Sequence, residues 1–173
     1  QPKVNQQNRL QHSFEESIKR KLIPGSSCLY VKIYGGVKTM DRVLTDVINP
    51  FVKTQIENKT IDRWFFIRYG DPHNHIRLRF FGNELFFGPI LKELQELLYP
   101  FIENKLVWKI QNDTYDRELE RYGFSNIEAS EELFYQDSAT TLDILSMLAG
   151  DEGDILRWQL AMRGTDYLLN DLG

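Results

Sequence analysis

Apolar and polar residues alternate with a period of two in several short stretches of the chain, as they do in half-buried β-strands. Residues 28–34 alternate in this way, with Leu29, Val31 and Ile33 on one side. Residues 63–69 and 75–81 are rich in aromatic and branched side chains, and Gly-Asp-Pro-His-Asn separates them. Because these intervening residues favour turns, the pattern predicts a β-hairpin. Residues 106–111 alternate again, with Leu106, Trp108 and Ile110 on one side, and are expected to form a fourth strand.

Apolar residues recur at helical spacing between these strands. Residues 43–52 form one such stretch, with Thr39 or Asp41 as its candidate N-cap. Residues 84–98 form the second, and its expected apolar stripe is Leu91, Leu94, Leu97 and Leu98. The element order is therefore β-α-β-β-α-β, which predicts an α+β fold with a ferredoxin-like antiparallel sheet. In that arrangement the first and third strands are central and both helices cover one face.

The remainder of the chain divides around this expected sheet. Residues 1–25 begin with a polar, Gln- and Asn-rich segment and are expected to be a linker or a frayed end. Residues 26–124 form the expected sheet domain. Residues 125–173 have helical periodicity throughout, with one helix over 127–135, another starting at Ser138 or Thr140 and a last one over 154–169. We expect them to form a helical extension that is truncated.

Composition excludes several functional classes. The chain has 173 residues, a net charge of −4 and a pI near 5.4, which argues against a general nucleic-acid-binding protein. The single cysteine, Cys28, fits a reducing compartment, and the three histidines show no zinc-ligand spacing. No phosphate-binding glycine loop and no apolar run of ~20 residues occurs. We therefore expect a cytoplasmic protein without a cofactor or metal.

Two arginines on the third predicted strand are the main candidates for chemistry. Strand alternation places His75, Arg77 and Arg79 on one side, and Ile76 and Leu78 on the other, which is the core side. The two guanidinium groups would lie roughly 6.5 to 7 Å apart. They could pair with carboxylates on neighbouring strands of a solvated sheet, or they could clamp an anionic ligand. The central position of this strand favours the anion site.

A second charged stretch follows the fourth predicted strand, from Thr114 to Gly123. If it turns helically, Glu118 and Arg121 are spaced i, i+3 on one surface and can pair. Taken alone, this pair is typical of a solvent-exposed ion pair of little energetic weight. Its position next to the predicted arginine strand makes it a second part of the candidate site.

Three segments together resemble the C-terminal domain of the class I lantibiotic dehydratases, also called the thiopeptide-type bacteriocin biosynthesis domain. They are Trp-Phe-Phe-Ile-Arg-Tyr-Gly-Asp-Pro with His-Ile-Arg-Leu-Arg-Phe at 64–80, Thr-Tyr through Glu-Leu-Glu-Arg-Tyr-Gly at 114–123, and Glu-Glu-Leu-Phe through Asp-Ser at 131–138. Their order, approximate spacing and several rare residues agree with that family. The resemblance spans residue 28 to about residue 169.

The resemblance implies a lyase that eliminates glutamate from glutamylated Ser or Thr side chains of a ribosomal precursor peptide, leaving dehydroalanine or dehydrobutyrine. It implies that Arg77, Arg79, Arg121 and Glu118 are the catalytic positions. Within the same segments we expect His75, Arg68 and Tyr115 to contact the substrate. The implied partners are a leader-bearing precursor peptide and a glutamylation domain or protein, with no direct binding of nucleic acid. Whether the chain forms a homodimer, or associates with a membrane through a biosynthetic complex, stays open.

The chain departs from the family pattern in two places. The family carries a functional histidine far toward the end of the domain, whereas no histidine follows His75 here. The family domain also continues beyond the equivalent of residue 173, so we expect a partial domain. Two alternatives remain: an enzyme that forms the pyridine ring of thiopeptides by cycloaddition, and a non-catalytic module that binds a leader peptide at a sheet edge.

Overall fold

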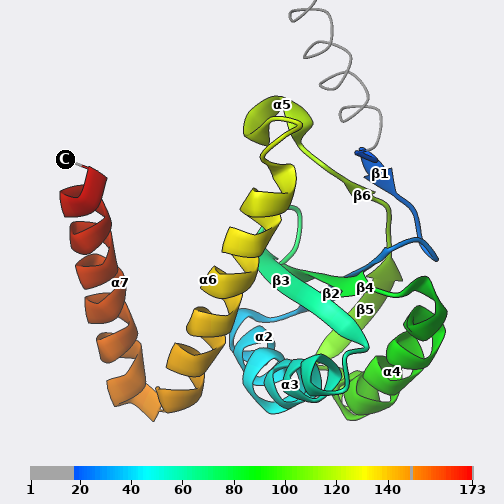
Figure 1. Cartoon of the computed structure of the whole chain (residues 1–173). Coiled ribbons are helices and arrows are strands. Elements are labelled where there is room, and N and C mark those ends of the chain that lie inside the picture. The colour runs from blue at the N-terminus through cyan, green and yellow to red at the C-terminus, as the bar shows by residue number, and fades with distance from the viewer. Residues whose placement is uncertain (1–17, 149, 173) are drawn as a thin grey trace, which may run out of the picture.

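Four strands form one antiparallel sheet in the computed structural model of the protein, which describes residues 18–148 and 150–172 (Figure 1). The strands are β2 (Cys28–Gly35), β3 (Ile61–Tyr69), β4 (His75–Gly82) and β5 (Val107–Asn112). Their order across the sheet is β3-β4-β2-β5, so the expected hairpin is present and β2 and β4 are central. Of the segment predicted to be a linker or frayed end at 1–25, residues 1–17 lie outside the described residues.

Helices cover one face of this sheet. They are α2 (Val37–Arg42), a π-helical segment (Val43–Ile48), α3 (Asn49–Glu57) and α4 (Phe87–Glu103), with a short 3-10 turn (Glu84–Phe86) before α4. Figure 1 shows α2, α3 and α4 together on this side. The largest fully buried side chains of the core between these helices and the sheet include Ile33, Leu44, Ile48, Leu78, Phe80, Leu94 and Leu98. The apolar sides of the predicted strands 28–34 and 75–81 therefore face the core as expected.

The first helical segment begins earlier than predicted. Gly36 is the residue before α2, and no side chain caps the helix, so Thr39 and Asp41 lie inside it. The prediction of either residue as the N-cap is wrong. Pro50 occupies the first turn of α3, directly after the π-helical segment. A proline is tolerated in a first helical turn because its missing N–H has no partner to lose there.

Two apolar residues that were predicted to be buried are exposed. Trp108 is 55% exposed, whereas Val107 beside it is 1% exposed. The pairing of β2 with β5 shifts register between Tyr34 and Gly35, and such a shift reverses which side chains face the core. Leu97 on α4 is also exposed, so the buried part of the stripe is Leu94 and Leu98. The predictions for Trp108 and Leu97 are therefore wrong.

Two long helices follow the sheet. α6 (Ile127–Met147) is one continuous helix, so neither Ser138 nor Thr140 starts a new one. It packs along β3, and the backbone N–H of Phe66 donates to the hydroxyl of Ser138 at 3.1 Å. α7 (Gly150–Leu172) diverges from α6 in Figure 1. An ion pair of 2.6 Å between Arg157 on α7 and Asp41 on α2 connects it to the sheet unit.

A smaller structure covers part of the other face of the sheet. The two-residue strands β1 (Lys21–Leu22) and β6 (Tyr115–Asp116) pair with each other, and the short helix α5 (Leu119–Tyr122) follows. On this side a second apolar cluster forms, consisting of Leu22, Cys28, Tyr30, Phe65, Phe81 and Tyr115, with Phe134 of α6 packed against it. The chain therefore encloses aromatic side chains on the face that carries the two predicted arginines.

Candidate functional site

The sheet face opposite α2, α3 and α4 carries the candidate residues in three rows. We call it the arginine face and define it by Tyr30, Phe65, His75, Arg77 and Arg79. Arg79 on β4 pairs with Tyr30 on β2 and with Phe65 on β3. The next rows centre on Arg77 and then on His75, because alternate residues of one strand share a face. The sequence-based placement of His75, Arg77 and Arg79 on one side is confirmed.

Arg79 is a buried guanidinium enclosed by aromatic rings. Its Cζ lies 4.5 Å from the ring centroid of Tyr30, 4.6 Å from that of Tyr115 and 5.0 Å from that of Phe65. The residue is only 6% exposed, and its Nε and Nη1 have no hydrogen-bond partner among the residues that the structure describes. Stacking on ring faces stabilises a cation without using its N–H groups. These donors are therefore available to an acceptor that enters the site.

Arg77 and His75 form a hydrogen-bonded pair beside this enclosure. The Nε of Arg77 donates to Nε2 of His75 at 3.0 Å, and Nδ1 of His75 donates to the backbone carbonyl of His73 at 2.8 Å. His75 is buried and stacks on the ring of Tyr34, while the guanidinium of Arg77 lies 3.4 Å from the ring centroid of Tyr69. Both ring nitrogens of His75 are thus engaged. In this arrangement His75 orients Arg77 and offers no lone pair to a proton.

Most other charges near the arginine face are paired. Lys32 forms a short ion pair with Asp113, and its hydrogen bond is the main cause that lowers the pKa of Asp113. Neither Arg77 nor Arg79 has an ion-pair partner among the described residues. Burial raises the pKa of Tyr30, and burial together with nearby Glu131 raises the pKa of Tyr115. Because both phenols stay neutral, they provide no negative charge to balance Arg79.

A buried carboxylate, which the sequence analysis did not identify, lies beside this site. Glu131 on α6 is 0% exposed and accepts two hydrogen bonds from Arg117, one from Nε and one from Nη2, both at 2.8 Å. It also accepts one from Nη2 of Arg63 at 2.9 Å. In the sequence, Glu131 is one of several acidic residues near the start of a predicted helix, where acidic residues are common. Its partners lie 14 and 68 residues away in the sequence, so helical periodicity carries no sign of them.

Glu118 and Arg121 are paired at the surface. Glu118 directly precedes α5 and Arg121 lies within it. The distance from Arg121 Nη1 to Glu118 Oε2 is 3.4 Å, so the predicted i, i+3 pair is confirmed. Their side chains are 61% and 71% exposed, and no contact between Arg121 and either sheet arginine occurs among the described residues. Aromatic contacts link their helix to the arginine face: Tyr122 packs on Phe134, and Phe134 packs on Phe65.

The two remaining candidates lie on different sides of the sheet. Tyr115 lies at the arginine face, where it is 7% exposed and stacks on Arg79. Arg68 does not lie on the arginine face. It occupies the alternate position on β3, and its Nη2 lies 2.5 Å from Oδ1 of Asp41 on α2. Strand alternation from Arg63 onward would have placed Arg68 on the helix-covered side, since it is an odd number of residues away.

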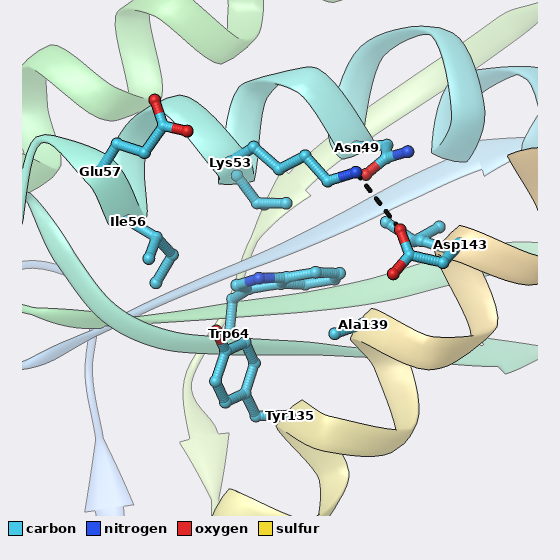
Figure 2. Close-up of a pocket in the computed structure, with 10 residues that line it drawn as sticks. Asn49, Lys53, Ile56, Glu57, Trp64, Tyr135, Ala139 and Asp143 are labelled. Carbon is cyan, nitrogen blue, oxygen red and sulfur yellow. Dashed lines mark hydrogen bonds and ion pairs between the residues drawn. The ribbon is translucent and has the colours of Figure 1, made fainter.

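A separate hollow lies between α3, β3 and α6. It has a volume of about 220 Å³, and Trp64, Tyr135 and Ala139 line its apolar part. Figure 2 shows the ion pair of Lys53 and Asp143 beside the indole of Trp64. Because Trp64 faces the helix-covered core, this hollow is on the opposite side of the sheet from Arg79. None of the predicted site residues lines it.

The part of the chain that the structure describes was compared with the requirements of a metal site and of a membrane-spanning helix, and it meets neither. Within residues 18–148 and 150–172, no group of three or more His, Cys, Asp or Glu side chains is arranged to hold a metal ion. In the same residues, no helix has the length and apolar character needed to cross a membrane.

Comparison with known proteins agrees with the arrangement of these motifs. The chain is 32% identical over 139 residues to the nisin biosynthesis protein NisB of Lactococcus lactis subsp. lactis, covering 79% of this chain and 13% of NisB. It is 35% identical over 132 residues to the subtilin biosynthesis protein SpaB of Bacillus subtilis, covering 76% of this chain and 12% of SpaB. The chain thus spans only a small part of these relatives.

Solved structures show the same similarity. The tRNA dependent lantibiotic dehydratase MibB from Microbispora sp. 107891 superposes with a TM-score of 0.62 at 34% identity, covering 70% of this chain and 12% of MibB. TsrL superposes with the same TM-score at 20% identity, covering 78% of this chain and 38% of TsrL, which shows a shared fold. The family model described as the C-terminal part of lantibiotic biosynthesis dehydratases matches residues 29–173. With this match over most of its length and with relatives above 30% identity, the protein belongs to the C-terminal domain family of the lantibiotic dehydratases.

Proposed function

We propose that this chain eliminates glutamate from glutamylated Ser or Thr side chains of a ribosomally synthesised precursor peptide. The observation that carries the proposal is Arg79, a buried cation with two free N–H donors and no counter-charge among the described residues. Buried charges are otherwise paired, because an unpaired one is costly. An anionic ligand would complete this site. The names of the relatives, which include a dehydratase, agree with such chemistry.

The arginines fit the needs of a β-elimination. In that step a base takes the Cα proton of the modified residue, the Cα–Cβ double bond forms, and the Cβ–O bond of the ester breaks to release a carboxylate. Arg79 can donate to the carboxylate as its charge grows, and Arg77 can orient the other end of the glutamyl group. We assign no base role to the arginines because a guanidinium stays protonated at any ordinary pH.

Glu118 and Arg121 would act at the edge of this site. Their exposed positions on α5 suit a role in holding the peptide portion of the substrate rather than the glutamyl group. A backbone carbonyl of the peptide could replace Glu118 as the partner of Arg121, because the separation of 3.4 Å between Glu118 and Arg121 at the surface makes a weak pair.

The sheet arrangement places the proposed site opposite the main helices. We assign the four-stranded unit to the ferredoxin-like class, supported by the order β3-β4-β2-β5 and by α2, α3 and α4 on a single face. The opposite face carries Arg77 and Arg79, and β1 and β6 cover part of it.

The test is mass spectrometry of a glutamylated precursor peptide incubated with the protein at its natural length. Wild type should convert the adduct to the dehydrated peptide. Arg79→Ala should leave glutamylated adducts, because removing one donor to a developing anion typically lowers kcat by about 10²- to 10³-fold. Arg77→Ala and Arg121→Ala should also leave adducts, because the substrate is then no longer held in the reactive orientation. Arg163→Ala, which removes an exposed arginine of α7, serves as the matched control.

The outcomes separate the alternatives. Persistence of the adduct with wild type would reject elimination for that substrate. A ring-forming product from a peptide that already contains dehydroalanines would support the cycloaddition reading. Binding of the leader peptide without any turnover would support the binding-module reading.

A further inference from the structure

We propose that Glu131 is a positioning residue for this site: it fixes Tyr115 against Arg79 and holds the segment that carries Glu118 and Arg121. The inference rests on the proposed function. It concerns a buried carboxylate that would not touch the substrate and that no step of the elimination requires directly.

The first step is the way in which Glu131 is bound. Its two carboxylate oxygens accept three charge-assisted hydrogen bonds, two from Arg117 and one from Arg63. The carboxylate also lies near the hydroxyl of Tyr115 and contributes, after burial, to raising the pKa of that phenol. A bidentate arginine–carboxylate pair fixes both distance and orientation. Glu131 therefore contacts side chains from two distant parts of the chain, Arg63 on β3 and the segment of Tyr115 and Arg117.

The second step is the place of Arg117 in the chain. It lies between Tyr115, which stacks on Arg79, and Glu118, which pairs with Arg121. Its backbone N–H donates to the carbonyl of Arg20 at 2.9 Å, and its Nη1 donates to the carbonyl of Lys19 at 3.2 Å. Without Glu131, the connection from β6 to α5 would be held by these two bonds and by the ion pair of Arg20 with Glu120. The bonds from Arg117 to Glu131 add a further contact at the point between both halves of the proposed site.

The third step is the rigidity of the element that carries Glu131. α6 spans 21 residues and is anchored to β3, where the hydroxyl of Ser138 accepts from the N–H of Phe66. The ring of Phe134, on the same helix, packs on Phe65 at 5.3 Å between centroids. Phe65 itself belongs to the enclosure of Arg79. α6 therefore contacts both β3, which carries Phe65, and the segment that carries Arg117.

The fourth step concerns charge. Three arginines, Arg63, Arg79 and Arg117, are buried or half-buried on this side of the sheet, and Glu131 engages two of them. Removing its charge would leave two more cations free to attract the carboxylate of a substrate. Glu131 thus leaves Arg79 as the unpaired guanidinium inside the aromatic enclosure, and this selects where an anion binds.

The first experiment compares Glu131→Gln with Glu132→Gln in the protein at its natural length. Glu132 neighbours Glu131 on α6 but is exposed and accepts only from Gln136, so its variant is the matched control. We expect Glu131→Gln to lower kcat for elimination about 10- to 100-fold, because small displacements of catalytic groups act on the chemical step. Glu132→Gln should behave as wild type.

A second variant separates positioning from folding. Glu131→Gln leaves two arginines without a buried partner and can unfold the domain. In Arg117→Met/Glu131→Leu the buried pair is replaced by apolar side chains of similar size, an exchange that often preserves stability, while Arg63, whose side chain is 24% exposed, can be hydrated. We expect this double variant to melt near the wild-type temperature yet to retain the loss of kcat.

Hydrogen exchange provides a readout that does not depend on activity. The amides of Arg121, Tyr122 and Gly123 are hydrogen-bonded within the α5 region, and they should exchange faster in the double variant while amides of β4 remain unchanged. Wild-type kcat in the folded double variant, or unchanged exchange in α5, would overturn the positioning role. If wild type itself does not eliminate glutamate, the proposed function fails, and the exchange result still decides whether Glu131 positions this segment.

Discussion

Replacing Arg79 with methionine should separate the stability of the fold from its function. Arg79 is 6% exposed, and two of its donors are unsatisfied among the described residues. Each buried donor without a partner costs about 1–3 kcal/mol. Each of its contacts with the three aromatic rings stabilises the folded protein by about 0.5–2 kcal/mol. Methionine has a similar length and keeps contacts of about 0.3–1.5 kcal/mol with each ring, but it has no donor to satisfy.

The exchange should therefore leave the free energy of unfolding unchanged or raise it by about 1–3 kcal/mol, as for other replacements of buried charges by apolar residues. Elimination of glutamate should be lost in the same variant. Urea denaturation followed by circular dichroism measures the first effect, and the mass-spectrometric assay measures the second. A stability gain together with a loss of activity is the expected combination when a strained polar group is retained for function.

Arg77→Met provides the opposite expectation on the same strand. Arg77 donates to Nε2 of His75, so its loss leaves a buried acceptor without a donor. We expect this variant to lose about 1–3 kcal/mol. A loss of more than about 1 kcal/mol in Arg79→Met, comparable with that in Arg77→Met, would refute the reasoning, because it would mean that the guanidinium of Arg79 is satisfied in the folded protein.

Three further outcomes follow from the packing around the sheet. Ser138→Ala should lower the free energy of unfolding by about 1–3 kcal/mol in urea, since the N–H of Phe66 loses its acceptor. Burial raises the pKa of Cys28 to about 12, so the thiol should react with an aromatic disulfide reagent at pH 8 only after denaturation. Burial opposes ionisation of Asp41, but the bonds from Arg157 and a second arginine outweigh it and lower the pKa of Asp41. The ionised carboxylate of Asp41 therefore adds to the free energy of unfolding above the pKa of the unfolded state, and this stabilisation is lost on acidification. Asp41→Asn should be less stable than wild type in urea at pH 7 and equally stable at pH ~2.

Local patterns were sufficient to predict much of the arginine face. Strand alternation placed Arg77 and Arg79 on one side, and the turn residues at 70–74 identified the hairpin. The helical spacing of Glu118 and Arg121 predicted their pair. Each of these predictions depends only on residues close together in the sequence, which is where backbone geometry determines the relation between side chains.

Features set by pairing between distant segments could not be read in this way. The register shift next to Gly35 exposes Trp108, although the alternation of residues 106–111 predicts the reverse. The continuous helix α6 passes through Ser138, whose hydroxyl serves β3 instead of capping a helix. In each case a contact between distant parts of the chain overrides a local preference.

The same distinction explains why the sequence could identify the arginines but not that Arg79 has unpaired N–H donors among the described residues. The ion pairs near the arginine face join residues that are 14, 68 and 81 positions apart, and only the fold determines these partners. Once Glu131 and Asp113 have taken theirs, Arg79 is left buried among neutral rings with donors unused. A fold selected for stability alone would pair or replace that group, because its burial is unfavourable. We therefore attribute its presence among rings from three separate strands to the anion that the proposed function requires at this site.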